Sequence, residues 1–251
     1  MTLILDSAEA EFAEKGYNGT TLASVAELAD VDTSLMRYYF GDKERLFEAV
    51  FMRRAPASNM LRQKAMAEYR ASAGDNMTLE GIIDCFTRPT FELAALDKGW
   101  RNYVAIVAYV STSRGFLRTL MTRAFDHVSY EMVADMKRIV PHASEEELYW
   151  AYFFMSGSYT FSLGGTERIN VLSKGKVSSL DFAGIARRLP VVIAAGMRAM
   201  FDAGADVDKR PFQPVGRNAL KAEVEAGWQE HHVRSAKASK PPRVPRQRRA
   251  A

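Results

Sequence analysis

Residues 20–43, TTLASVAELADVDTSLMRYYFGDK, decide the fold of the N-terminal part of the chain. The stretch opens with Thr20 and Thr21, whose hydroxyls suit the free N–H groups at the start of a helix. Apolar residues then recur at the helical spacing of three and four positions, at Leu22, Val25, Ala26 and Ala29. The pattern predicts a short helix that ends before a turn at Asp30-Val31.

A second short helix is predicted over residues 33–40, after a cap residue at Asp32. Met36, Tyr39 and Phe40 are spaced to anchor this helix to the rest of the domain. The side chains expected to project from it are those of Thr33, Ser34, Arg37 and Tyr38. Two such helices around a tight turn form a helix-turn-helix, whose second helix enters the DNA major groove with its N-terminus first. The stretch therefore predicts a unit that reads double-stranded DNA.

The wider stretch 3–51 resembles the N-terminal domain of the TetR family of bacterial transcriptional regulators. The strength of the match, over about a fifth of the chain, lies in the order and spacing of its residues. The matching residues are Ile4, Ala8, Phe12, Gly16, Tyr17, Thr20, Thr21, Val25, Ala26, Val31, Tyr39, Phe40, Lys43, Glu44 and Leu46. The resemblance implies a three-helix DNA-binding domain followed by a larger helical domain that binds an effector and dimerises.

The resemblance also assigns roles in DNA binding. Hydroxyl, phenol and ammonium groups suit a phosphate acceptor. Phosphate contacts are accordingly expected from Thr20, Thr21, Tyr38, Tyr39 and Lys43. Base edges are expected to be read by Thr33, Ser34, Arg37 and Tyr38.

The chain departs from the family pattern at three points. Asp30 stands where glycine is usual in the turn, and aspartate tolerates a positive φ better than most residues. Arg37 stands where tyrosine is usual. An arginine can bond guanine O6 and N7 or pair with a phosphate, and both roles remain open. The chain also begins almost at its first helix, so the basic arm of many relatives is absent or the true start lies upstream.

The rest of the chain predicts an all-α protein, with no strand pattern and no internal repeat. Helices are expected near residues 58–73, 78–87, 100–112, 116–139, 144–164 and 180–202, with Pro56 and Pro89 among the breaks between them. Ser144 and Glu147 match a capping box. The expected domains are a reader over 1–48, an effector-binding and dimerisation domain over 49–206, and a basic tail over 207–251.

Charge is distributed unevenly along the chain. Residues 1–54 hold six Lys/Arg and ten Asp/Glu residues, a net charge of −4, whereas residues 207–251 hold eleven and four, a net of +7. Most of the acidic residues of the first helix are expected to face solvent, away from the duplex; this set is Asp6, Glu9, Glu11 and Glu14. Residues 217–233 could add an amphipathic helix. The tail is either a non-specific DNA clamp or a solubilising extension.

An effector pocket is expected within residues 80–165, where aromatic residues are dense. Any single one of these residues is more often core than ligand contact, but the surplus suggests an apolar cavity with a few polar groups. The candidate lining residues are Phe91, Trp100, Tyr103, Phe116, Arg123, Phe125, His127, Ser158 and Tyr159. From residue 99 onward the chain is similar to TetR relatives that respond to lipophilic molecules, which implies a small hydrophobic effector.

Helices 144–164 and 180–202 carry more apolar surface than one inner face requires, which suggests a homodimer. TetR-like proteins dimerise through a four-helix bundle of their last two helices, and the candidate interface residues are Tyr149, Tyr152, Phe153, Ile185, Leu189, Val192 and Met197. A two-fold dimer would place two reading helices roughly 34–36 Å apart on an inverted repeat. We therefore predict a repressor that an effector releases from its operator.

The sequence disfavours enzymes, metal sites and cofactors. The four histidines lack metal-ligand spacing, adjacent His231 and His232 included, and no phosphate loop or nucleophile elbow is present. No long apolar run predicts a membrane span, and Cys85, the single cysteine, fits a buried position in a cytoplasmic protein. Two alternatives stay open, a protein-partner scaffold with weakened DNA binding and a lipophile-binding helical protein.

Overall fold

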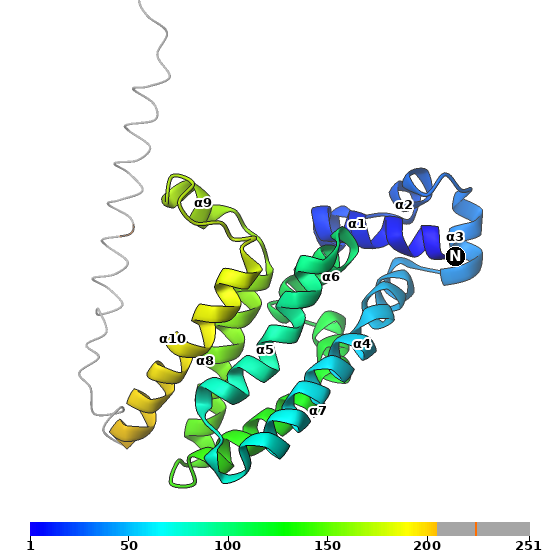
Figure 1. The fold of residues 1–251 in the computed structure, drawn as a ribbon. Helices are drawn as coiled ribbons and strands as arrows, with labels where there is room; N and C mark the ends of the chain where they lie inside the picture. Colours follow the sequence, from blue (N-terminus) through cyan, green and yellow to red (C-terminus); the bar gives the residue numbers. More distant parts are fainter. Residues whose placement is uncertain (205–223, 225–251) are drawn as a thin grey trace, which may run out of the picture. The chain divides into compact units, whose positions relative to one another are not determined.

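Ten α-helices and one short 3-10 helix make up the part of the chain that the computed structural model describes, residues 1–204 and Val224 (Figure 1). They are α1 (Thr2–Gly19), α2 (Leu22–Leu28), α3 (Thr33–Phe40), α4 (Lys43–Ala73), η1 (Gly74–Asn76), α5 (Leu79–Leu96), α6 (Lys98–Ser111), α7 (Phe116–Ile139), α8 (Glu145–Leu163), α9 (Arg168–Leu172) and α10 (Phe182–Ala203). The predicted all-α class is confirmed.

Polar cap residues begin several of these helices, as the sequence predicts. The Asp32 carboxylate accepts from the Ser34 N–H at 2.6 Å at the start of α3, and Asp42 accepts from the Arg45 N–H at 2.9 Å at the start of α4. The capping box of α8 is present: the Ser144 N–H donates to Glu147 at 2.8 Å, and the Glu147 N–H donates to the Ser144 hydroxyl at 3.2 Å. Each cap accepts from an N–H that has no partner within the helix.

Two backbone turns shape the N-terminal helices. Gly16 interrupts α1 with φ 67° and ψ 177°, a conformation that is essentially restricted to glycine. Tyr17 follows this break, stacks against Phe12 and meets Phe47 edge-to-face. Asp30 has φ 51°, as expected for a residue that replaces glycine between α2 and α3.

Helix α4 is continuous over 31 residues, so the expected break at Pro56 is wrong. Pro89 likewise lies inside α5. A proline in a helix interior removes one N–H bond and crowds the preceding turn, but apolar packing on both sides of it can outweigh that cost. Phe51, Ala55 and Met66 of α4 are buried on both sides of Pro56.

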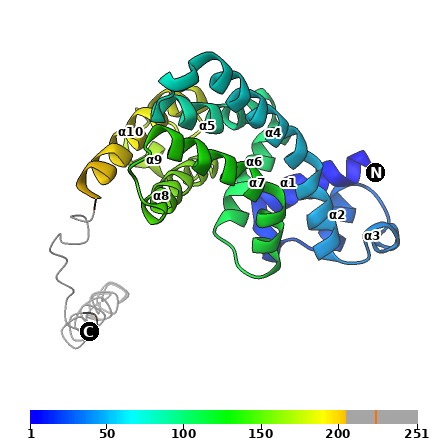
Figure 2. The ribbon, with the colours of Figure 1, turned by 90° about the horizontal axis from the view of Figure 1, so that it is seen from below.

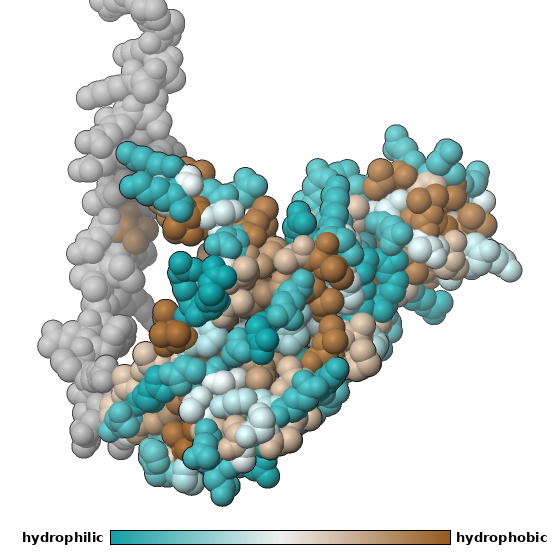
Figure 3. Space-filling view, in the orientation of Figure 1, coloured by the Kyte–Doolittle hydropathy of each residue, from teal (hydrophilic) through white to brown (hydrophobic). Residues whose placement is uncertain are grey.

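The larger part of residues 1–204 is a bundle around α5. Helix α5 packs against α4, α6 and α10, while α7 covers α4 and α8 packs on α10 and α6. Figures 1 and 2 show α1–α3 at one end of α4, with α8 and α10 away from them. The space-filling view in Figure 3 shows hydrophilic and hydrophobic residues interspersed on the face seen in Figure 1. Helix α1 contacts both α4 and α6, so the N-terminal helices rest on two elements of the bundle.

The expected boundary between residues 48 and 49 falls within α4, and contacts join residues 1–204 into one unit. The division into a reader and an effector domain therefore stays a prediction. The tail expectations for 207–251, with the helix over 217–233 and His231-His232, lie outside the described residues. Across the described part of the chain, no helix combines the length and apolar character needed to cross a membrane.

Candidate functional site

Helix α3 presents a polar face to solvent. Met36 and Phe40 are buried and anchor the helix, as predicted, and α3 packs on α2 and α4. Ser34, Arg37 and Tyr38 are exposed on the other side, and the Tyr38 side chain is 82% exposed. Helix α3 thus offers a hydroxyl, a guanidinium and a phenol from one rigid element, and these are groups that bond base edges and phosphates.

Tyr39 and Leu35 differ from expectation. Tyr39 is 51% exposed and lies edge-on to Tyr38 with 5.2 Å between ring centroids, so its expected anchoring role is wrong. The phenol of Tyr39 is free to meet a phosphate. Leu35 is also exposed, and the sequence analysis overlooked it because leucine usually marks a core position. An exposed leucine on a reading helix could contact a thymine methyl group.

Thr20 is fully buried, so its expected phosphate contact is wrong. Its hydroxyl donates to the Gly16 carbonyl at 2.9 Å and lies 3.2 Å from the Glu11 carbonyl, which ties α1 to the start of α2. Thr21 is exposed and caps α2 in a capping box with Ser24. Thr21 is therefore the member of the pair that can reach DNA.

Lys43 is partly engaged within the protein. Its ammonium donates to the Tyr17 carbonyl at 2.9 Å and the Thr20 carbonyl at 3.0 Å, and it lies 4.3 Å from the centre of the Tyr17 ring. An ammonium has three N–H donors. Two of them satisfy carbonyls at the C-terminal end of α1, and the third remains for a phosphate.

A shallow hollow of about 400 Å³ lies between the starts of α2 and α4. Its lining residues are Thr20, Thr21, Leu22, Arg37, Gly41, Asp42 and Lys43. The hollow brings the exposed Thr21 hydroxyl, the Arg37 side chain and the Lys43 ammonium to one place beside the N-terminus of α2, where backbone N–H groups also favour an anion. These residues could hold a DNA phosphate.

Most acidic residues of α1 were expected to face solvent, but two of the four are buried. Glu9 and Glu11 are buried, and only Glu14 is exposed without a recorded partner among the described residues. Glu11 pairs with Lys15 at 2.7 Å, and the hydrogen bond from Lys15 lowers the pKa of Glu11. The Glu9 carboxylate bonds Arg53 and Arg54 of α4. The negative charge of this helix is thus largely neutralised by neighbouring cations.

The expected effector-pocket residues separate into three groups. Phe91, Tyr103, Phe125 and Tyr159 are buried inside the bundle. Phe116 packs on Tyr17 of α1 and Phe47 of α4, so its ring joins the bundle to the N-terminal helices, while Trp100 of α6 packs beside Arg54 of α4. Ser158 is half-buried.

Arg123 and His127 are exposed on α7, and their expected place inside a pocket is wrong. Arg123 instead pairs with Glu48 of α4 at 2.5 Å. Both residues lie on the outward-facing side of α7, whereas Ala124 and Val128 on the opposite side are buried. Both residues were expected in the pocket because of their chemical type alone, but their positions on α7 direct them away from the interior of the bundle.

Arg62 of α4 was not expected at the centre of the bundle. Its side chain is buried, with Nε 2.8 Å from the Phe86 carbonyl and Nη2 3.0 Å from the Thr90 hydroxyl and 2.9 Å from the Tyr159 hydroxyl. Its guanidinium lies 4.4 Å from the centre of the Phe86 ring. The only sequence signal was the spacing of Arg62 on the buried face that also holds Ala55, Asn59 and Met66.

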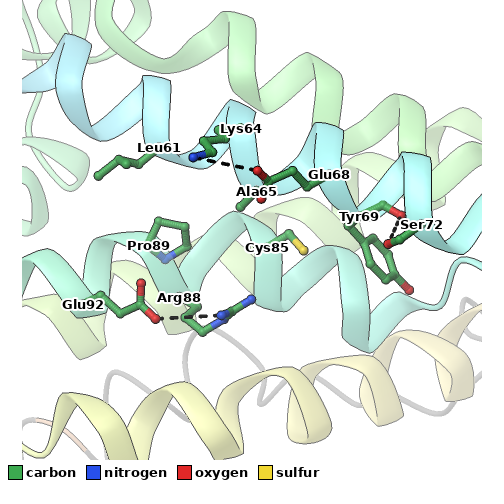
Figure 4. A pocket seen from close by; sticks show the side chains of 10 residues that line it. All are labelled: Leu61, Lys64, Ala65, Glu68, Tyr69, Ser72, Cys85, Arg88, Pro89 and Glu92. Carbon is green, nitrogen blue, oxygen red and sulfur yellow. Dashed lines mark hydrogen bonds and ion pairs between the residues drawn. The ribbon is translucent and has the colours of Figure 1, made fainter.

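A second hollow, of about 490 Å³, opens between α4 and α5 (Figure 4). Its charged walls are largely paired: Lys64 lies 3.8 Å from Glu68, and Arg88 lies 2.8 Å from Asp84. The Cys85 thiol faces this hollow, and burial raises its pKa. A protonated thiol is a poor nucleophile, which agrees with the expected structural role of Cys85.

The candidate dimer-interface residues differ in how exposed they are. Tyr149 and Phe153 of α8 and Val192 of α10 are exposed. Met197 is buried within its own subunit, so its expected interface role is wrong. Tyr152, Ile185 and Leu189 are partly buried against the core, and the Tyr152 hydroxyl donates to Ser129 at 2.6 Å. Four further residues, which were not among the candidate interface residues, are exposed on the same two helices: Trp150, Phe154, Phe161 and Val191.

Comparison with known proteins identifies the family. The sequence model described as "Bacterial regulatory proteins, tetR family" matches residues 4–50, and "Tetracyclin repressor-like, C-terminal domain" matches residues 84–196. The chain is 42% identical over 148 residues to the HTH-type transcriptional regulator BetI of Burkholderia thailandensis, a match that spans 57% of this chain and 71% of that protein. The chain belongs to the TetR family. As a TetR-family member it is a ligand-responsive DNA-binding transcriptional regulator.

Further TetR-family relatives and solved structures agree with this assignment. BetI of Burkholderia mallei is 36% identical over 139 residues, which cover 54% of this chain and 68% of that protein. FadR of Bacillus subtilis, solved in complex with stearoyl-CoA, has a TM-score of 0.55 at 14% identity and covers 78% of this chain and 98% of its own. FadR of Bacillus halodurans has a TM-score of 0.53 at 16% identity, with 78% and 95% covered. At these identities the structural likeness shows the shared TetR-family fold alone.

Proposed function

We propose that this TetR-family regulator is a homodimeric repressor that a small lipophilic effector releases from an inverted-repeat operator. The DNA-binding part of this proposal is supported by the exposed face of α3, with Thr21 and Lys43 beside it. Four side chains of α3 are proposed to read base edges, namely Thr33, Ser34, Arg37 and Tyr38. The proposed phosphate contacts are Thr21, Tyr38, Tyr39 and Lys43.

The dimer is supported by an apolar surface on α8 and α10 that no other described part of the chain covers. Trp150, Phe153 and Phe154 form a ring cluster with centroids 5.7–6.0 Å apart, and Phe153 is 63% exposed. Val191 and Val192 are exposed on the neighbouring α10. Large exposed apolar patches of this kind mark protein interfaces, and a second copy of the same two helices would complete a four-helix bundle.

The effector is proposed to bind among the buried rings of the bundle. Phe91, Phe125 and Tyr159 lie there, with Arg62 at their centre. Helix α4 runs from this region to Lys43, so a change in its packing would change the placement of α3. Release requires that the effector bind the DNA-incompetent conformer more tightly than the DNA-competent one.

No catalytic role is proposed for this protein. Within residues 1–204, no cluster of three or more His, Cys, Asp and Glu side chains could hold a metal ion. The proposed target is bacterial DNA, so we also propose the cytoplasm as its compartment.

Fluorescence anisotropy on DNA flanking the protein's own gene, against scrambled DNA across a salt series, tests the proposal. We expect tighter binding to an inverted repeat than to scrambled DNA at every salt concentration. Tyr38→Ala should weaken this binding, whereas Tyr130→Ala, which removes an exposed tyrosine of α7, should not. Equal and steeply salt-dependent binding to both DNAs would show phosphate attraction without sequence reading and would contradict the proposal.

A further inference from the structure

Arg62 is a buried cation with no acidic partner among the described residues. Its side chain is 3% exposed, and none of the ion pairs between described residues includes it. A buried charge is costly unless an opposite charge compensates it. By contrast, the buried carboxylates among the described residues, Glu9, Glu11 and Asp135, each meet at least one lysine or arginine.

The hydrogen bonds of Arg62 leave donors unused. Nε and Nη2 are satisfied by the Phe86 carbonyl and the Thr90 and Tyr159 hydroxyls, while Nη1 has no hydrogen-bond partner among the described residues. Because these hydroxyl oxygens accept from Arg62, their own protons remain available. The cluster therefore offers several N–H and O–H donors around one positive charge.

Two further buried polar atoms near this cluster lack hydrogen-bond partners within the described part of the chain. The Tyr103 hydroxyl is fully buried and has none, and Asn59, one turn before Arg62 on α4, leaves its Oδ1 unpaired while its Nδ2 donates to the Ala124 carbonyl at 2.6 Å. Burial raises the pKa of the Tyr103 phenol, so this group keeps its proton and stays a donor. Buried polar groups normally have partners, and exceptions often mark a functional site.

Aromatic rings surround the cluster. Phe86, Phe125 and Tyr159 have ring centres 4.4, 5.7 and 5.8 Å from the Arg62 guanidinium carbon, and Phe91 lies edge-on to Tyr159. Ring faces attract a cation but do not neutralise its charge. The surroundings suit a molecule with an apolar body and one charged group.

We propose that the effector carries an anionic head group, a carboxylate or a phosphate, that pairs with Arg62 and accepts from the hydroxyls of Thr90, Tyr103 and Tyr159, with its apolar part among the surrounding rings. This inference rests on the proposed function, since it names the chemical class of the effector. The two N–H groups of Nη1 have no described partner and can donate to either oxyanion. A cationic effector is disfavoured, because it would bring a second positive charge beside Arg62 in a region of low dielectric constant.

The test compares three ligands with the same apolar chain, namely decanoate, decan-1-ol and decyltrimethylammonium, all below their micelle concentrations. Octanoate and dodecanoate, each compared with its alcohol, vary the chain length. Decyl phosphate distinguishes a phosphate head group from a carboxylate head group. Isothermal titration calorimetry on the full chain measures binding. We expect a carboxylate or the phosphate to bind at least about tenfold more tightly than the matched alcohol, since a hydrogen-bonded charge pair contributes more than a neutral one.

Arg62→Met should remove this preference, Arg62→Lys should retain part of it, and Arg118→Met, which removes an exposed arginine of α7, should leave it unchanged. If the Arg62→Met protein fails to fold, the comparison of ligands on the unmodified chain still tests whether the effector carries an anionic head group. Equal affinities for acid and alcohol, or tightest binding of the ammonium ligand, would overturn the anionic head group while leaving a lipophilic effector in place. Absence of binding by every acid and by the phosphate would reject the proposed ligand class, while operator anisotropy on the same preparation tests the DNA-binding proposal separately.

Discussion

Replacement of Glu9 should weaken the packing of α1 against α4 and so lower the stability of the protein. The Glu9 side chain, 2% exposed, accepts three hydrogen bonds across the boundary between α1 and α4. Arg54 donates through Nε at 2.8 Å and Nη2 at 3.1 Å, and Arg53 donates through Nη2 at 2.8 Å. Arg54 also lies 4.7 Å from the centre of the Trp100 ring of α6, so one carboxylate organises three helices.

The size of the effect follows from these contacts. Hydrogen bonds to charged groups contribute about 1.5–3 kcal/mol each, but the three bonds are not additive here. Arg53 keeps its 2.8 Å bond to Asp6, and the two arginine side chains are 22% and 20% exposed, so both recover part of their hydration. Removal of one member of a buried ion pair costs about 3–5 kcal/mol. We therefore expect Glu9→Ala to lower the free energy of unfolding by about 3 kcal/mol, near the lower limit.

Urea and thermal unfolding followed by circular dichroism, at one fixed protein concentration, measure this change. For a unit of this size, a loss of about 3 kcal/mol lowers Tm by roughly 6–12 °C. Glu9→Gln keeps an acceptor oxygen and should lose roughly half as much. Glu14→Ala, at an exposed position of the same helix, is the matched control. A loss below about 1 kcal/mol, or one equal to that of the control, would refute the reasoning.

Three further predictions concern the backbone, the DNA contact and the pH dependence. Gly16→Ala should lower the free energy of unfolding by about 1–3 kcal/mol, because a Cβ strains the backbone at φ 67°, ψ 177°; an unchanged urea midpoint would contradict this. Arg37→Ala should cost about 1–3 kcal/mol in operator binding and relax specificity if Arg37 reads a base, whereas an equal loss on all sequences would make it a phosphate contact. Hydrogen bonds from the Ser144 N–H and hydroxyl lower the pKa of Glu147 in the folded protein. Its stabilising contribution is therefore present above the unfolded pKa and is lost as the pH falls through the lower folded value. The stability difference between the unmodified chain and Glu147→Gln should be constant near neutral pH and shrink below about pH 4.5, and a difference independent of pH down to pH 2 would argue against it.

Local chemistry predicted much of the fold. Caps such as Asp32 and Ser144 act within three residues of their own position, so a linear sequence contains both partners of each bond. The positive φ of Asp30 followed in the same way from the tight turn between two short helices. Pro56 of α4 and Pro89 of α5 were wrongly expected to break their helices, because burial of the neighbouring turns is a tertiary effect that no local pattern contains.

The candidate site was predicted less well, for a related reason. Adjacent Thr20 and Thr21 have the same chemistry, and only the close approach of α1 shows that the first is buried. Arg62 and Glu9 are charged residues that a sequence places on the surface by default. Each is buried because partners far away in the chain, Tyr159 for Arg62 and Arg54 for Glu9, meet it in the folded protein.

The length of α4 sets how finely its direction must be controlled. From Arg62 to Lys43 the helix rises about 28 Å, at about 1.5 Å per residue. A rotation of about 7° around the Arg62 end would move the Lys43 end by about 3.4 Å, which is one base-pair step. In a two-fold dimer the two displacements can add, so a few degrees at each subunit can change the spacing of the reading helices by up to two steps. Core substitutions that shift the axis of α4 slightly should therefore alter operator affinity, although they touch neither DNA nor effector.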